Sequence, residues 1–170
     1  MDFKLTPAQI TDQSQALSFL QSAAKSLAKK GVDQWQYWLN PPKDELAWLE
    51  DGLRNGDYYF IQLNSDEIAG MVRIQTEDHL YWGEKADQAW YIHSLIVEEK
   101  WAGLQLGTNV LEKIELDAIE SNQDFLRLDC LASNEKLCSY YQNQGFEKVG
   151  QVDLPLSTCN LYEKKIGASN

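Results

Sequence analysis

The 170-residue sequence has few cysteines, few basic residues and no long apolar run. Its three cysteines are an odd number without a closely spaced pair, which disfavours a disulfide framework and a zinc site built from paired ligands. Nowhere do about 18 apolar residues follow one another, and the opening residues lack the basic start and apolar segment of a signal peptide. We therefore expect a cytoplasmic protein with reduced thiols, no membrane partner and no bound metal.

Basic residues are scarce: 15 Lys and Arg stand against 26 Asp and Glu, so the net charge is -11. This charge disfavours nucleic acid as a partner and is compatible with a cationic substrate, although it also serves solubility alone. Six tryptophans and eight tyrosines are present, most of them expected in the core. Some of these ring faces would attract a cationic amine.

The length and the 44% of hydrophobic positions predict one well-filled core. We expect a single domain over residues 1–166 and a frayed tail over residues 167–170. The chain is expected to act as a monomer or a homodimer.

The hydrophobic pattern predicts an alternation of helices and strands. Helices are expected from Thr11 or Asp12 to Gly31 and over 43–54, 106–121 and 134–144. The expected strands are 3–5, 58–63, 68–75, 90–97, 125–130, 146–152 and 158–165. Segment 32–40 is predicted to be irregular and aromatic, and 76–88 a long polar loop. The helix between strands 90–97 and 125–130 predicts a βαβ unit with parallel strands.

The stretch from Tyr91 to Thr108 combines an apolar strand, a glycine-containing turn and a helix start. Such a turn directs backbone N–H groups toward one point, and the first turn of the helix adds unpaired donors. The stretch therefore favours a phosphate site, although the same order of elements occurs in α/β proteins that bind no phosphate.

Two sequence blocks resemble the GCN5-related N-acetyltransferase (GNAT) superfamily, as does the order of elements. The family turn reads Q/R-x-x-G-x-G/A and corresponds to residues 102–107. Ala102 replaces the Arg or Gln and Gln105 replaces the first glycine, while Gly107 remains.

The second block, over residues 134–146, resembles the family pattern N-x-x-A-x-x-x-Y-x-x-x-G-F. It matches at Asn134, Tyr141, Gly145 and Phe146, and only Leu137 departs. The resemblance covers nearly the whole chain and points to the bacterial-type small-molecule branch.

This resemblance implies an α/β (α+β) GNAT acyl-CoA N-acyltransferase fold, with a central mixed sheet of about seven strands flanked by four helices. It also implies an N-acetyltransferase that moves an acetyl group from acetyl-CoA, its co-substrate, to a primary amine by direct attack in a ternary complex. Segments 32–40 and 76–88 are expected to build the acceptor pocket. Their acidic and aromatic content favours a small cationic amine, with a peptide amine as the next choice.

The resemblance also implies the cofactor-binding residues. The edge formed by Leu95, Ile96 and Val97 would bind pantetheine, with the Leu95 N–H polarising the acetyl carbonyl. The pyrophosphate would lie against the backbone of Ala102, Gly103, Leu104, Gln105, Leu106, Gly107 and Thr108.

Two side chains of the second block are expected to complete the donor site. Asn134 would reach the pantetheine arm or a water molecule, and it is also suited to be a helix N-cap. Tyr141 would protonate the leaving CoA thiolate, with Tyr140 packing beside it.

The general base is expected to be His93, which a period of two places on one strand face with Tyr91 and Leu95. A structural role for His93 remains the alternative, as does a base or cation selector among Glu77, Asp78 and His79.

Ala102 and Gln105 motivate a rival hypothesis, a CoA-binding regulatory or interaction domain without turnover. Gln105 is strained by about 1 to 2 kcal/mol if its position requires a positive φ; if the position requires only close approach, its side chain either flanks the phosphates or weakens their binding.

Overall fold

The computed structural model describes residues 2–167, so residues 168–170 of the predicted frayed tail lie outside the described part. The described residues form two compact units. The first unit contains residues 2–74 and 94–107, and the second contains residues 75–93 and 108–167. A single domain over residues 1–166 stays a prediction.

The strands form one seven-stranded mixed sheet in the order β1-β2-β3-β4-β5-β7-β6. Their bounds are β1 Phe3–Pro7, β2 Tyr58–Leu63, β3 Ile68–Gln75, β4 Ala89–Val97, β5 Phe125–Leu131, β6 Glu147–Leu154 and β7 Ser157–Lys165. Antiparallel pairing joins β1 to β2, β2 to β3, β5 to β7 and β6 to β7. The pair β4 and β5 is parallel, with Ala89–Ile92 beside Phe125–Leu128, as the βαβ prediction requires.

The described residues contain five α-helices and three short 3-10 turns. The α-helices are α1 Gln13–Lys29, α2 Lys43–Asn55, α3 His79–Trp82, α4 Leu106–Glu120 and α5 Glu135–Asn143. The 3-10 turns are η1 Ile10–Asp12, η2 Gln36–Leu39 and η3 Glu99–Trp101. The predicted fold class is therefore confirmed, with α3 as one helix more than the four expected. None of the helices in the described range has the length and apolar character required to span a membrane.

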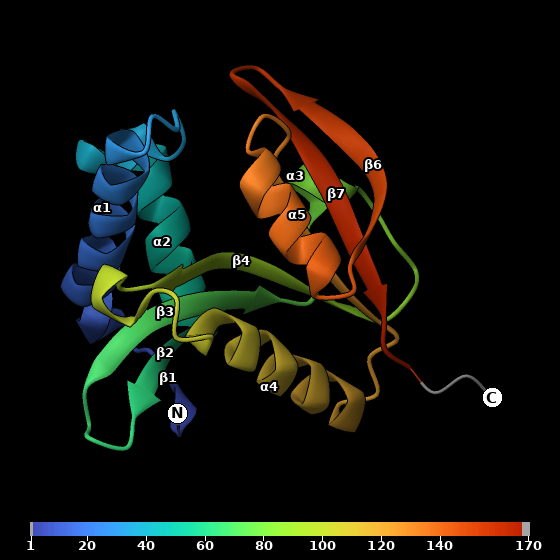
Figure 1. Cartoon of the computed structure of the whole chain (residues 1–170), viewed down its shortest axis with the longest axis horizontal. Coiled ribbons are helices and arrows are strands. Elements are labelled where there is room, and N and C mark those ends of the chain that lie inside the picture. The colour runs from blue at the N-terminus through green and yellow to red at the C-terminus, as the bar shows by residue number, and fades with distance from the viewer. Residues whose placement is uncertain (1, 168–170) are drawn as a thin grey trace. The chain divides into compact units, whose positions relative to one another are not determined.

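In the first unit, α1 and α2 lie side by side and pack on the sheet (Figure 1). Most buried residues of this core come from α1, α2, β2, β3 and β4, and they include Leu20, Leu49, Tyr58, Met71 and Ile96; Ala8 and Trp38 of η2 complete it. Helix α2 ends at Asn55 because Gly56 takes a φ of 76°, a left-handed conformation that glycine adopts without steric cost.

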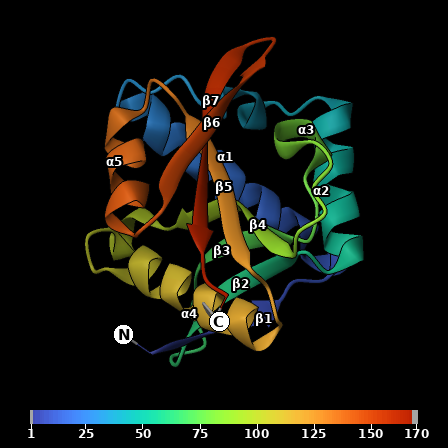
Figure 2. The ribbon, with the colours of Figure 1, turned by 90° about the vertical axis from the view of Figure 1, so that its right-hand side faces the viewer.

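In the second unit, β7 lies between β5 and β6 (Figure 2). A buried arginine on β5, Arg127, holds this unit together. Its guanidinium donates to the Asp87 carboxylate at 2.6 and 2.7 Å, to Glu163 Oε2 at 2.7 Å and to the Tyr91 hydroxyl at 2.9 Å. Because these partners come from β4, β7 and the loop before β4, Arg127 fixes the loop that follows α3 against the sheet.

Candidate active site

Residues 102–107, which we name the glycine turn, lie in the first unit; residues 102–105 connect η3 to α4, and Leu106 and Gly107 begin α4. Gly103 has a φ of 77° and Gln105 a φ of 61°. The positive φ of Gln105 decides between the two alternatives given above for this position. The backbone is left-handed there, so a non-glycine residue is strained. Ala102, Gly103, Leu104 and Gln105 are all exposed. The Ala102 N–H is already used, since it donates to the Glu99 carbonyl at 3.0 Å. The donors that an anion could meet therefore come from the later residues of the turn and from the first turn of α4.

Strand β4 changes its backbone conformation just before the predicted pantetheine edge. Ser94 has a φ of 49°, which is rare for a non-glycine residue within a strand. The strict period of two that placed His93 and Leu95 on one face is therefore interrupted between them.

The end of β4 is held closely against β3. The Glu98 N–H donates to the Ala69 carbonyl at 2.9 Å. A Cβ atom on Gly70 would lie 1.9 Å from the Ile96 carbonyl oxygen, so only glycine fits there. Leu95, Ile96 and Val97 thus belong to a strand end whose backbone position is fixed within the first unit.

In the second unit, His93 lies between two aspartates, and we name Asp78, His93 and Asp129 the carboxylate–histidine cluster. The His93 Nε2 atom is 2.9 Å from Asp78 Oδ2, and the His93 Nδ1 atom is 3.6 Å from Asp129 Oδ1. The side chains are 6%, 13% and 12% exposed, in the order Asp78, His93, Asp129. Among the described residues, one donor atom from each lies within 4.8 Å of the others, so these three could also hold a metal ion.

The position of Asp78 in this cluster depends on α3. Asp78 is the N-cap of α3, where its Oδ1 accepts the Tyr81 N–H at 3.2 Å. At the other end of α3, the Trp82 ring lies 5.9 Å from the Tyr91 ring and 5.2 Å from the Arg127 guanidinium. Because α3 is anchored at Trp82, its N-terminus holds Asp78 against β4.

The Asp129 carboxyl is the unusual group of the cluster. Burial raises the pKa of Asp129 from 3.8 to about 6, the positive charge of protonated His93 opposes this rise, and the negative charge of Asp78 adds to it. Asp129 Oδ1 is buried and has no hydrogen-bond donor among the described residues. A buried carboxylate oxygen without a donor is rare, and perturbed carboxyls of this kind are concentrated at functional sites.

Tyr141 is buried on α5 in the same unit, with its ring 5.4 Å from Tyr140, 6.0 Å from Phe146 and 6.4 Å from Tyr162. Burial is the main cause that raises the pKa of the Tyr141 phenol well above 10. The phenol therefore keeps its proton over the physiological pH range. Tyr140, predicted to pack, has its hydroxyl 3.4 Å from Thr108 Oγ1.

Asn134 and the cysteines lie near Tyr141 in the chain. Asn134 is the N-cap of α5, where its Oδ1 accepts the Leu137 N–H at 3.2 Å, so the predicted capping role is confirmed. The three cysteines are buried free thiols, as predicted. Sequence spacing did not reveal that Cys130 and Cys138 lie with their sulfurs 3.5 Å apart, because β5 and α5 fold back on each other.

The structure thus assigns the predicted residues to the two units separately. Leu95, Ile96, Val97 and the glycine turn belong to the first unit. His93, Thr108, Asn134 and Tyr141 belong to the second. Sequence reasoning missed Asp129, although an acidic residue between Leu128 and Cys130 in an apolar strand is itself a signal, since such residues are seldom buried without a role.

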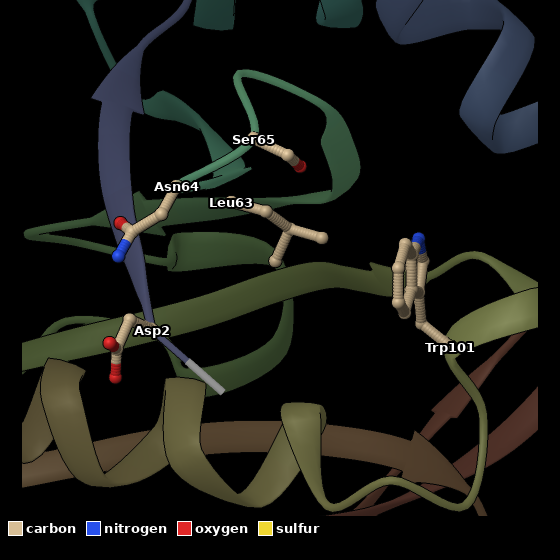
Figure 3. A pocket seen from close by; sticks show the side chains of 5 residues that line it. All are labelled: Asp2, Leu63, Asn64, Ser65 and Trp101. Carbon is tan, nitrogen blue, oxygen red and sulfur yellow. The ribbon is translucent and has the colours of Figure 1, made fainter.

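A hollow of about 320 Å³ lies in the first unit, between the β2–β3 turn and η3 (Figure 3). It is lined by Asp2, Leu63, Asn64, Ser65 and Trp101, and the Trp101 ring stands beside Leu63 in this view. None of the residues predicted to bind or to react lines it.

The element order and the sheet order define an α/β acyltransferase fold. A model of the Acetyltransferase (GNAT) family matches residues 25–146, and the chain belongs to this family.

Relatives of known name agree with this assignment. The chain is 28% identical over 171 residues to the Bacillus subtilis (strain 168) protein named Uncharacterized N-acetyltransferase YesJ, covering 98% of this chain and 92% of that protein. The crystal structure of a GNAT family acetyltransferase from Listeria monocytogenes 4b F2365 is similar with a TM-score of 0.79 and 26% identity, over 96% of this chain and 94% of that chain.

The fold is also that of the Microcin C7 self immunity acetyltransferase MccE, solved in complex with acetyl-CoA and AMP. That structure has a TM-score of 0.69 and 19% identity, over 97% of this chain and 93% of that chain. The predicted family is therefore confirmed, and the chain is an acyltransferase of the N-acetyltransferase class.

Proposed function

We propose that this acetyltransferase moves an acetyl group from acetyl-CoA to the primary amine of a small cationic acceptor, by direct attack in a ternary complex. The observation that carries the proposal is the glycine turn: in a chain of the GNAT family, two positive φ angles lead directly into α4. This backbone is suited to a pyrophosphate, because its donors do not depend on side-chain identity.

The donor-binding roles follow the family residue by residue. The backbone of residues 102–108 would bind the pyrophosphate, and the strand end Leu95, Ile96 and Val97 would bind pantetheine. Asn134 would reach the pantetheine arm while it caps α5. The Leu95 N–H would stabilise the oxyanion, a contribution whose loss in other enzymes costs about 2.7 to 4 kcal/mol.

Tyr141 would donate its proton to the CoA thiolate when the tetrahedral intermediate collapses. Burial keeps this phenol protonated until the thiolate forms, although the raised pKa also makes it a weaker acid. The acceptor amine, in turn, arrives as an ammonium ion and must lose a proton before it attacks. The sequence pointed to His93 for this step, and because both His93 nitrogens face carboxylates, we assign the step to the carboxylate–histidine cluster as a whole.

A cationic acceptor is supported by charge. The chain carries a net charge of -11, and two carboxylates of the cluster are largely buried in one place. An ammonium group is the ligand that such a place favours. We further propose a cytoplasmic location, because the close but unjoined thiols of Cys130 and Cys138 suit a reducing compartment.

The rival function is a CoA-binding regulatory domain without turnover, and the strain at Gln105 favours it. Calorimetry with acetyl-CoA and CoA, followed by a thiol-release assay on a panel of primary amines, separates the two. The proposal predicts binding of both nucleotides and thiol release with at least one amine. Binding without release on any amine favours the rival, and no binding at all excludes both functions.

A further inference from the structure

We propose that Tyr58 is a positioning residue for acyl transfer: when acetyl-CoA is bound, its buried hydroxyl donates to the Ser94 hydroxyl, and this bond keeps Ser94 in the conformation that directs the Leu95 N–H. This inference rests on the proposed function, in which the Leu95 N–H stabilises the oxyanion. The residues that carry it all belong to the first unit.

Ser94 is a strained position in β4. Its φ of 49° places a residue that has a side chain in the left-handed region, within a strand. Such a conformation persists only when its surroundings fix it, and it is found most often at functional sites. Because Ser94 directly precedes Leu95, its conformation sets the direction of the peptide group that contains the Leu95 N–H.

Strand β3 fixes the backbone of β4 just after this position. Gly70 lies so close to the Ile96 carbonyl that a Cβ atom would not fit, and the Glu98 N–H donates to the Ala69 carbonyl at 2.9 Å. A side-chain contact at Ser94 extends this hold to the residue that carries the strain.

The Tyr58 hydroxyl is the group placed to make this contact. Tyr58 is fully buried on β2, and Arg73 and Ser94 both interact with its hydroxyl. With no described residue, however, does the hydroxyl meet the full geometry of a hydrogen bond. A buried hydroxyl without a partner destabilises a folded protein. Hydrogen bonds that serve catalysis are often long in the free enzyme and shorten when substrates bind, which accounts for such a donor here.

A rigid environment fixes the direction of this hydroxyl. Arg73 is opposite Tyr58 in the register of β2 and β3, and its guanidinium lies 5.2 Å from the Tyr58 ring and 4.0 Å from the Trp48 ring. It donates to Asp57 Oδ2 at 2.9 and 3.2 Å and to the Trp48 carbonyl at 3.2 Å. On α2, a Cβ atom at Gly52 would lie 2.6 Å from the Tyr58 ring, so only glycine fits there. The ring is therefore held by β3 and α2 together.

The Tyr58 phenol is a neutral donor at physiological pH. Burial is the main cause that raises the pKa of Tyr58 well above 10, and the positive charge of Arg73 opposes only part of this rise. No proton leaves Tyr58 or Ser94 during the reaction. Both residues therefore act through the Leu95 N–H, and the chemical balance is that of the proposed function.

The first test needs no turnover. In the full-length protein with ¹⁵N-labelled leucine and bound acetyl-CoA, Tyr58→Phe should shift the Leu95 N–H signal. Its urea midpoint should be no lower than that of the wild type, because the variant loses a hydroxyl without a partner. Tyr59→Phe is the matched control, since Tyr59 is the next residue of β2 and faces the opposite side of the sheet.

A Leu95 signal that Tyr58→Phe leaves unchanged, or shifts no more than Tyr59→Phe does, overturns the inference. If the wild type does not bind acetyl-CoA, the proposed function fails and the inference fails with it.

The second test uses an amine that the wild type acetylates. Tyr58→Phe should lower kcat about tenfold and leave the KM for acetyl-CoA within about twofold, because a misdirected oxyanion donor acts in the transition state. Ser94→Ala removes the acceptor of the same bond and should give a similar loss. The double variant should lose no more than either single variant. A loss below about twofold in Tyr58→Phe, or losses that add in the double variant, overturns the role of Tyr58 while the proposed function stands.

A rescue separates positioning from direct participation in the chemistry. Glycine adopts the left-handed conformation without steric cost, so Tyr58→Phe combined with Ser94→Gly should recover about half of the wild-type kcat although both hydroxyls are absent. No recovery would show that the conformation of Ser94 is not what the Tyr58 hydroxyl controls, and would overturn the inference.

Discussion

The glycine turn and the carboxylate–histidine cluster differ in which part of the chain would carry their chemistry. The turn is exposed, and its candidate function depends on backbone N–H groups held by positive φ angles at Gly103 and Gln105. The cluster is largely buried, and its candidate function depends on three side chains, Asp78, His93 and Asp129. The turn should therefore keep its anion binding when side chains change, as long as the backbone conformation is kept. The cluster should lose its candidate function when a single side-chain atom is replaced.

A large effect on the side-chain chemistry is expected from Tyr141→Phe. Loss of the proton donor should lower kcat by about 10²-fold, within the range of general acid catalysis, and leave acetyl-CoA affinity unchanged. Stopped-flow thiol release measures this. Tyr140→Phe is the matched control. Tyr140 is the sequence neighbour of Tyr141, and the 3.4 Å between its hydroxyl and Thr108 Oγ1 is long for a hydrogen bond, so little is lost with the hydroxyl. Equal rates for the two variants would remove Tyr141 from the mechanism.

A second prediction concerns the stability cost of the cluster. The folded-state pKa of Asp129 is raised to about 6 from 3.8, so the folded protein holds the proton more tightly than the unfolded chain does. The ionised Asp129 carboxyl therefore lowers the free energy of unfolding. This cost is absent below pH about 4, grows as the pH rises from about 4 to 6, and stays constant at higher pH. Asp129→Asn should be more stable than the wild type by about 2 to 3 kcal/mol at pH 7.5 and by less at pH 5.

Urea unfolding at the two pH values measures this difference, with Asp117→Asn as the control. A difference between Asp129→Asn and the wild type that does not change with pH would show that the carboxyl is not perturbed. An asparagine that destabilises the protein more at pH 7.5 than at pH 5 would reverse the sign of the argument.

These two regions also differ in how far the sequence predicts them. The strands 58–63 and 68–75 were predicted to the residue, because a polar turn separates two runs rich in apolar and β-branched residues. The glycine turn follows from a local motif, and the predicted start of the next helix at Leu106 is confirmed. Whether Gln105 adopts a strained, positive φ could not be predicted, because the sequence alone does not determine the φ angle of a single residue.

The cluster was only partly predicted. His93 was identified from its strand, but its partners come from β5 and from the N-cap of a helix with a single turn, and no local pattern joins these residues. Helix α3 itself was missed because four residues give no helical period, and because its start depends on the bond between Asp78 and the Tyr81 N–H. The sequence could not predict this cluster because it depends on contacts between segments that are far apart in the chain.

A third prediction addresses the backbone of the glycine turn. Gly103→Ala places a Cβ at a φ of 77°, which should strain the turn by about 1 kcal/mol and weaken acetyl-CoA binding about fivefold. Gly31→Ala is the matched control, because Gly31 has a φ of 73° and equally open space around it. Both variants should lose similar stability, and only Gly103→Ala should lose affinity in calorimetry. Equal affinities in the two variants would contradict a donor site at this turn.

The smallest effect is expected from the second histidine. The His79 side chain is 61% exposed and lies 3.3 Å from Glu77, whereas His93 is enclosed by two aspartates. His79→Asn should change the unfolding free energy by less than about 0.5 kcal/mol and leave the pH–rate profile unchanged. A shifted acid limb in this variant would return the loop histidine to the list of candidate bases.

The central claim is that the backbone of the glycine turn binds acetyl-CoA, while the buried side chains of the cluster accept a proton. Acetyl-CoA binding to Asp129→Asn tests this claim most directly. Calorimetry should give a Kd within twofold of the wild type for this variant, although its turnover is lost. A Kd weakened as much as that of Gly103→Ala, or more, would show that the two regions do not act separately and would contradict the account.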